Sequence, residues 1–176
     1  MSNRSASDKL LWYFYQFDRS IFELLESANH SDSVTLEWYE DIDIENDFWG
    51  ENIQVKYLTS QNILLQDWSL AENEHIEKPI LLSFLTYCET GRPQKVFWYY
   101  NWESTQTINI DTEQLSAIIF RRRSLLNASQ NSILDWIDDS HKNGFTASFS
   151  IQVVDKTYEQ QVAEVREKVK MAFTLS

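Results

Sequence analysis

Apolar residues recur along the chain at two different spacings, one typical of helices and one typical of strands. Near the N-terminus they follow one another at steps of three and four residues, which predicts an amphipathic helix over 7–28. Farther along, 34–45 and 52–59 each alternate apolar with polar side chains, which predicts two strands. The residues of 46–51 are typical of a turn, so we expect the two strands to pair as a hairpin.

The rest of the chain continues with four more helices and two more strands. Helices are predicted over 74–89, from a cap at Asp111 or Thr112 to Leu125, over 132–140 and over 157–173, and strands over 96–102 and 145–154. The resulting order is α-β-β-α-β-α-α-β-α, and no helix or strand is assigned to 60–73. This order predicts the α/β class, with a central mixed β-sheet flanked by helices.

Length and composition indicate one folded domain. The 176 residues, 43% of them hydrophobic, fit a single domain over 1–176 with a real core, and we expect 1–7 to be disordered. The single cysteine, Cys88, excludes a disulfide within the chain and favours a reducing compartment. Because neither a signal-peptide pattern nor an apolar run of membrane-spanning length is found, we expect a cytoplasmic protein with no membrane contact.

The net charge changes this picture, because 15 Lys and Arg residues stand against 27 Asp and Glu residues, giving −12. An acidic surface repels nucleic acid at long range. The charge therefore counts against a DNA-binding function and favours a protein that acts through an acidic interaction surface.

One cluster on the predicted hairpin carries candidate chemistry. Gln54 and Lys56 lie two residues apart, so both project from one face of the second strand, and Asp41 on the first strand comes close to them if the hairpin closes at 46–51. Glu37 lies four residues before Asp41, so both side chains project from the same face of the first predicted strand. Carboxylate and amide oxygens bind Mg²⁺ (or Mn²⁺), and an adjacent lysine suits metal-assisted phosphodiester hydrolysis. The same spacing also occurs on a solvated, charged strand face, which is the alternative.

The residues of 34–42, followed by Ile53-Gln54-Val55-Lys56-Tyr57, resemble a known nuclease domain. The domain is the N-terminal endonuclease of bacterial anti-phage effectors that are signalled by cyclic oligonucleotides, and it belongs to the PD-(D/E)xK superfamily. The resemblance covers 10–60 by motif and continues to about residue 173 by the order of helices and strands. It implies a restriction-endonuclease-like core and a metal-dependent DNA endonuclease that takes part in anti-phage defence and acts on double-stranded DNA.

The resemblance also implies a role for each matching residue. Asp41 would bind the metal, Gln54 would stand where the superfamily motif has Glu, and Lys56 would be the motif lysine. Glu37 would support the metal, and the Tyr15-Gln16 pair of the first helix would support the site. The catalytic set is therefore Asp41, Gln54, Lys56 and Glu37, and the metal ligands are Asp41, Gln54 and Glu37.

The chain departs from the family's pattern in two ways. The usual Asp-Asp pair reads Glu40-Asp41 here, which is a conservative change. The family's effectors usually carry a second, ligand-sensing domain, for which this chain is too short. The activating signal stays open, and the chain fits a homo-oligomer or a subunit of a defence complex.

Two functions therefore remain open from the sequence. The first is the nuclease, and the second is a catalytically inert, acidic interaction subunit or a DNA-mimicking inhibitor. Convergence of the Asp41, Gln54 and Lys56 side chains within about 5 Å discriminates between them. The basic run Arg121-Arg122-Arg123 allows contact with a DNA backbone or with a partner's acidic face, or local pairing with carboxylates.

Overall fold

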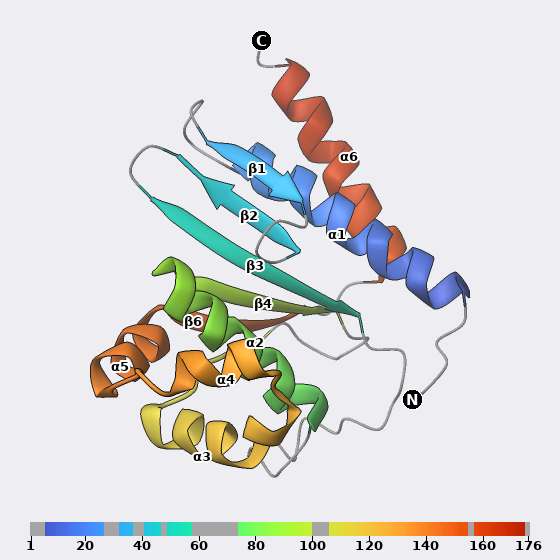
Figure 1. The fold of residues 1–176 in the computed structure, drawn as a ribbon. Coiled ribbons are helices and arrows are strands. Elements are labelled where there is room, and N and C mark those ends of the chain that lie inside the picture. The colour runs from blue at the N-terminus through green and yellow to red at the C-terminus, as the bar shows by residue number, and fades with distance from the viewer. Residues whose placement is uncertain are drawn as a thin grey trace.

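The computed structural model describes residues 6–26, 32–36, 41–46, 49–57, 74–99, 106–154 and 157–174. Within these ranges the chain is an α/β fold in which helices flank a six-stranded mixed sheet (Figure 1). The helices are α1 (Ala6–Glu26), α2 (Glu74–Thr90), α3 (Thr112–Arg122), the 3-10 helix η2 (Arg123–Leu125), α4 (Ala128–Leu134), α5 (Asp139–Ser148) and α6 (Tyr158–Thr174). The strands are β1 (Ser33–Leu36), β2 (Ile42–Glu45), β3 (Gly50–Tyr57), β4 (Gln94–Tyr99), β5 (Gln106–Ile108) and β6 (Phe149–Val154).

The strand order across the sheet is β1-β2-β3-β4-β6-β5. β1, β2 and β3 form an antiparallel meander, whereas β3, β4 and β6 run parallel to one another, and β5 is antiparallel to β6. Parallel neighbours need a crossover connection, and α2 lies in the connection from β3 to β4. β3 is therefore the strand at which the antiparallel half of the sheet meets the parallel half.

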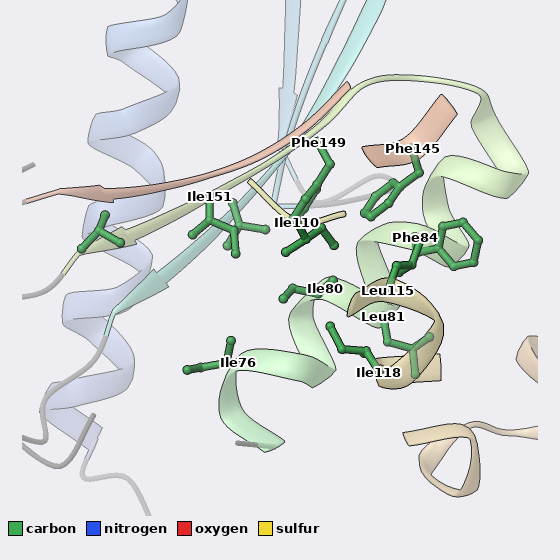
Figure 2. Packing of buried hydrophobic residues seen from close by; sticks show 12 residues of the cluster. Ile76, Ile80, Leu81, Phe84, Ile110, Leu115, Ile118, Phe145, Phe149 and Ile151 are labelled. Carbon is green, nitrogen blue, oxygen red and sulfur yellow. The ribbon is translucent and has the colours of Figure 1, made fainter. Parts of the chain in front are cut away.

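The larger core lies between the sheet and the helices α2, α3 and α5. It includes Ile80 and Phe84 of α2, Leu115 of α3, and Phe149 and Ile151 of β6, all of which are buried. Figure 2 shows the α2 and α3 side chains gathered against Phe149 and Ile151. Burial of such side chains stabilises a fold by about 1.5–3 kcal/mol each, so this cluster fixes α2 on the parallel half of the sheet.

The opposite face of the sheet is covered by α1 and α6, which lie side by side (Figure 1). Tyr15 of α1 is buried there against Ile42, Ile53 and Val55, and its ring meets Tyr158 of α6 edge to face. Because side chains alternate along a strand, the residues between these apolar positions point to the α2 face. Gln54 and Lys56 of β3 belong to that second set.

One predicted strand is two strands in the structure. The segment 34–45 contains β1 and β2, which pair antiparallel with Leu36 opposite Ile42, so the chain reverses direction between them. The alternation of apolar and polar residues indicates which side chains face the core, but not the direction in which the chain runs. Both strands lie in the same sheet with the same face covered by α1, so the pattern runs through the reversal without a visible break. The hairpin predicted to close at 46–51 is confirmed. It joins β2 to β3, with Glu45 opposite Gly50.

The prediction was also wrong between 132 and 148. The helix expected over 132–140 is replaced by α4 and α5, and the strand expected from 145 begins at Phe149. A capping box at Asp138 starts α5. Gly144 does not end a helix but lies within α5, where a Cβ atom would collide with the Tyr87 hydroxyl. Phe145 of α5 and Phe149 of β6 stack on each other at the junction. Their four-residue spacing fits one face of a helix and also the alternation of a strand.

Other boundaries agree closely with the predictions. Gly91 adopts a φ of 69° directly after α2 and ends that helix, and Asp111 caps α3 with a capping box. The short edge strand β5 was not predicted, because three residues are too few for a periodic signal. In the part of the chain that the structure describes, no helix has the length and apolarity to cross a bilayer.

Candidate active site

Asp41 directly precedes β2, and we call the place where it meets Val55 and Lys56 of β3 the notch. β2 begins at Ile42, which pairs with Ile53, whereas β3 continues beyond this pair to Tyr57. The Oδ2 atom of Asp41 accepts a hydrogen bond from the backbone N–H of Val55 at 2.6 Å. The carboxylate therefore binds the part of β3 that extends beyond the first residue of β2, and this bond holds it against the neighbouring strand.

Lys56 follows Val55 directly and forms an ion pair with the same carboxylate. Its Nζ atom lies 4.0 Å from Asp41 Oδ2, with the lysine side chain 29% exposed and the aspartate side chain 15% exposed. Water screens a partly buried pair less than a fully exposed one. A fixed positive charge and a fixed negative charge thus stand side by side at the surface of the notch.

Gln54 of β3 is the third residue of the predicted set. Its side chain shares the α2 face of β3 with Lys56 and is 5% exposed. The peptide that joins Gln54 to Val55 supplies the N–H group that binds Asp41. The structure therefore brings the Asp41 carboxylate and the Lys56 ammonium group together, and it places the buried Gln54 on the same stretch of β3.

A row of buried polar side chains lies next to this set, and the sequence did not single out its members. Asn52 donates from Nδ2 to Asp43, and Gln94 of β4 donates from Nε2 to Asn52 Oδ1 at 2.9 Å and to the Arg92 carbonyl at 2.9 Å. Asp43, Asn52 and Gln94 are each at most 1% exposed. Hydrogen bonds between buried polar groups rigidify their surroundings, so this row ties β2, β3 and β4 together beside the site. The Oε1 atom of Gln94 has no hydrogen-bond partner among the described residues.

A signal for this row does exist in the sequence. Asn52, Gln54 and Lys56 follow one another at two-residue steps. The three polar side chains therefore lie on one face of a strand whose other face is apolar. Asp43 has the parity of Asp41, and the register pairs it with Asn52. Asp43 therefore faces a structural amide, which separates its role from that of Asp41.

The other predicted site residues stand apart from this set. Glu37 and Glu40 lie outside the described residues. Tyr15 and Gln16 are buried in α1, on the face of the sheet opposite to Gln54. Tyr15 is part of the apolar core there, and Gln16 lines a groove between α1 and β1.

The basic run of α3 is engaged in ion pairs. Arg121 and Arg122 both bind the carboxylate of Glu77, whose side chain is 1% exposed, and Arg123 binds Asp135 at 2.7 Å. Two arginines around one buried carboxylate satisfy its lone pairs as a buried charge requires. Local pairing with carboxylates, one of the predicted alternatives, is therefore what this run does.

The donor set of the notch can be compared with what a metal ion requires. Within the described ranges, no group of three or more His, Cys, Asp or Glu side chains is placed to hold a metal. Mg²⁺ needs fewer protein ligands than that, because it retains several waters and is bound through one or two carboxylates. The Asp41 carboxylate is a hard oxygen donor of this kind and is partly exposed, and the Gln54 amide oxygen is a second such donor whose Oε1 atom is buried from solvent.

The comparisons with known proteins add no relative. No family model matches the chain, no curated protein matches it, and no solved structure matches it. The function is therefore inferred from the geometry of the notch and from the residues that form it.

Proposed function

We propose that this chain is a metal-dependent DNA endonuclease of the PD-(D/E)xK type, with Asp41, Gln54 and Lys56 as its catalytic set. The observation that carries the proposal is the 4.0 Å approach of Lys56 Nζ to Asp41 Oδ2 across two strands. The buried Gln54 belongs to the same stretch of β3. A carboxylate and an ammonium group that meet across neighbouring strands, with an amide side chain on the same stretch, are the kinds of group that a metal-dependent hydrolase needs.

The arrangement of the strands supports the proposal. The candidate aspartate precedes the middle strand of an antiparallel meander, the Gln-x-Lys triplet lies on the next strand, and a helix then crosses to a parallel strand. The helix, the aspartate segment and the Gln-x-Lys strand thus follow one another in the order by which the chain resembles the nuclease domain. The resemblance of 10–60 to anti-phage effectors is the basis for the proposed setting in defence against phage.

The residues divide the chemistry between them. Asp41 and Gln54 would hold Mg²⁺ or Mn²⁺, with Glu37 as a further candidate ligand, and the metal would polarise the phosphoryl oxygen and activate water. Lys56 orients the attacking water by hydrogen bonding and offsets the negative charge that develops on the scissile phosphate. Asp41 holds Lys56 in place through the ion pair, and the backbone of Val55 holds Asp41.

The acidic surface determines how DNA would be engaged. With a net charge of −12 and two of the three clustered arginines bound to Glu77, long-range attraction to a phosphate backbone is weak. We therefore expect DNA binding to depend on metal, on a homo-oligomer or on a basic partner in a defence complex. Tight binding of duplex DNA by the isolated monomer at physiological salt would contradict this expectation.

The test is nicking of supercoiled plasmid by the purified chain with magnesium or manganese. Lys56→Ala is compared with Lys95→Ala, a matched control because Lys95 also lies on a strand and pairs with a carboxylate, that of Glu51, at 2.9 Å. The proposal predicts metal-dependent nicking that is lost in Lys56→Ala and retained in Lys95→Ala. A folded chain that nicks nothing with either metal would instead support the acidic interaction subunit or the DNA-mimicking inhibitor.

A further inference from the structure

The C-terminal helix α6 is attached to the rest of the chain chiefly by its packing on α1. Only Gln161 and Val165 of its 17 residues are buried, and its last four residues, 171–174, are all exposed. Figure 1 shows its C-terminal end pointing away from the sheet. Because burial of apolar side chains is the main force that holds a helix in place, α6 is held by little of that force.

The interface between α6 and α1 also contains polar atoms that are buried without a hydrogen-bond partner. Gln161, which is 4% exposed, donates from Nε2 to the Tyr15 carbonyl at 3.2 Å, whereas its Oε1 atom has no partner among the described residues. The Oδ2 atom of Asp18 on α1 is likewise buried without a partner among these residues. An unsatisfied buried polar atom weakens the packing in which it lies, and separation of the helices would expose both atoms to water.

Asp18 is an ionisable group of this interface, and its charge weakens the docking of α6. Burial raises the pKa of Asp18 above its usual value, and the hydrogen bond from Tyr158 and the charge of Arg166 oppose this rise without cancelling it. A raised carboxyl pKa means that the ionised form is less favourable in the docked state than in water. A neutral side chain of the same shape at this position should therefore strengthen the docking.

Other contacts between the two helices are individually weak. The Tyr158 ring stacks on Phe14 with the ring centroids 5.9 Å apart. The Nζ atom of Lys168 lies 4.5 Å from the centre of the Phe22 ring and pairs with Glu26. A ring pair, a cation–π contact and a surface ion pair each contribute little, so α6 can leave α1 without breaking strong interactions.

We propose that α6 is a detachable cover, which separates from α1 as a unit while the sheet and the core under α2 stay folded. Its release uncovers the aromatic side chains of α1 that it contacts, which include Phe14 and Phe22. An element held by few buried apolar contacts opens at a lower free energy than the whole domain. The larger core contains no residue of α6 and stays intact in the open state. This equilibrium does not depend on the proposed nuclease activity.

The test is hydrogen exchange of the full chain, followed by mass spectrometry over a series of urea concentrations below the unfolding transition. The amides of α6 should exchange at least about 100-fold faster than those of α2. Their exchange should also depend less on urea, because a local opening exposes little surface. Hydroxyl-radical labelling of Phe14 and Phe22 reports whether the opening uncovers α1.

Two matched variants separate local opening from global unfolding. Val165→Ala removes the buried valine of α6 and should speed the exchange of α6 about 10-fold, raise the labelling of Phe14 and Phe22, and leave α2 unchanged. Val153→Ala removes a valine of the larger core that is 1% exposed, and it should speed the exchange of α2 and leave α6 unchanged. Asp18→Asn should slow the exchange of α6 about 3- to 10-fold, because it removes the charge and keeps an acceptor for Tyr158.

Three results would overturn the proposal. In the first, α6 and α2 exchange at the same rate with the same dependence on urea, or Val153→Ala accelerates both alike, which would show that α6 opens only when the whole domain unfolds. In the second, α6 exchanges at the rate of an unstructured peptide, which would show that it is not docked. In the third, Val165→Ala speeds the exchange of α6 without raising the labelling of Phe14 and Phe22, which would show that α6 frays and uncovers nothing.

Discussion

The Oδ2 atom of Asp41 accepts a hydrogen bond from the backbone N–H of Val55 at 2.6 Å while it lies 4.0 Å from the Nζ atom of Lys56. One oxygen thus contacts two consecutive residues of the neighbouring strand. The position of Asp41 is set by β3 as much as by its own segment, so any change that shifts β3 should also shift the carboxylate.

Gln54→Glu should strengthen metal binding, because it adds a second carboxylate at the position where the superfamily motif has Glu. Affinity for hard cations rises with the number of charged ligands, and we expect a gain on the order of tenfold for Mg²⁺. Isothermal titration calorimetry with magnesium measures this gain. Gln152→Glu, on β6, is the control, and equal gains in both variants would argue against a metal site at Gln54.

Glu77→Ala should destabilise the fold by about 3 kcal/mol, because it leaves Arg121 and Arg122 without their shared carboxylate. Urea unfolding followed by tryptophan fluorescence measures the free energy of unfolding. Glu89→Ala, an exposed position on the same helix, is the control and should stay within about 0.5 kcal/mol of the parent. A small effect at Glu77 would mean that the pair contributes little to stability.

Cys88 should be nearly inert toward alkylation in the folded protein. Burial, with a smaller contribution from Glu89, raises the pKa of its thiol to about 12. At pH 8 the thiolate fraction is then on the order of 1,000-fold below that of a free cysteine. Mass spectrometry after iodoacetamide treatment should show labelling in urea and very slow labelling without it. Rapid labelling of the folded chain would show that Cys88 is accessible and ionised.

The cap of α5 should make stability depend on acid pH. Hydrogen bonds from Ser140 and His141 lower the pKa of Asp138 below its usual value. A lowered carboxylate pKa contributes stability that is complete above about pH 4 and is lost as pH falls through the lowered pKa. The difference in Tm between the parent and Asp138→Ala should therefore shrink as the pH falls below about 4. A difference that does not change with pH would contradict the ionised cap.

Much of the fold was predictable because strong periodicity and caps mark its long elements. α1, α2, α3 and α6 each carry an apolar face, and Gly91 and Asp111 mark where α2 ends and α3 begins. The alternation of 34–45 could not reveal the reversal between Leu36 and Ile42, because both strands present the same face to α1. Phe145 and Phe149 fit either period, and stacking between them decided for a helix–strand junction.

The candidate site was predictable in part for a similar reason. Parity places Gln54 and Lys56 on one face, and the short turn after Glu45 brings Asp41 near them. The alternation of a strand shows which residues share a face, but not which residue lies opposite which on the next strand. The pairing of Asp43 with Asn52 could therefore not be predicted. Gln94 joins the row from β4, which follows a helix and a crossover, and no local pattern in the sequence reports such a contact.

The most direct test of the nuclease proposal compares Asp41→Asn with Glu51→Gln in plasmid nicking over a range of magnesium concentrations. The asparagine side chain can still accept the hydrogen bond of Val55 while it removes the charge, and Glu51 is a matched strand carboxylate that pairs with Lys95 at 2.9 Å. The proposal predicts at least about a 100-fold lower nicking rate for Asp41→Asn and a parent-like rate for Glu51→Gln. Equal rates in the two variants, or nicking that persists in EDTA, would contradict it.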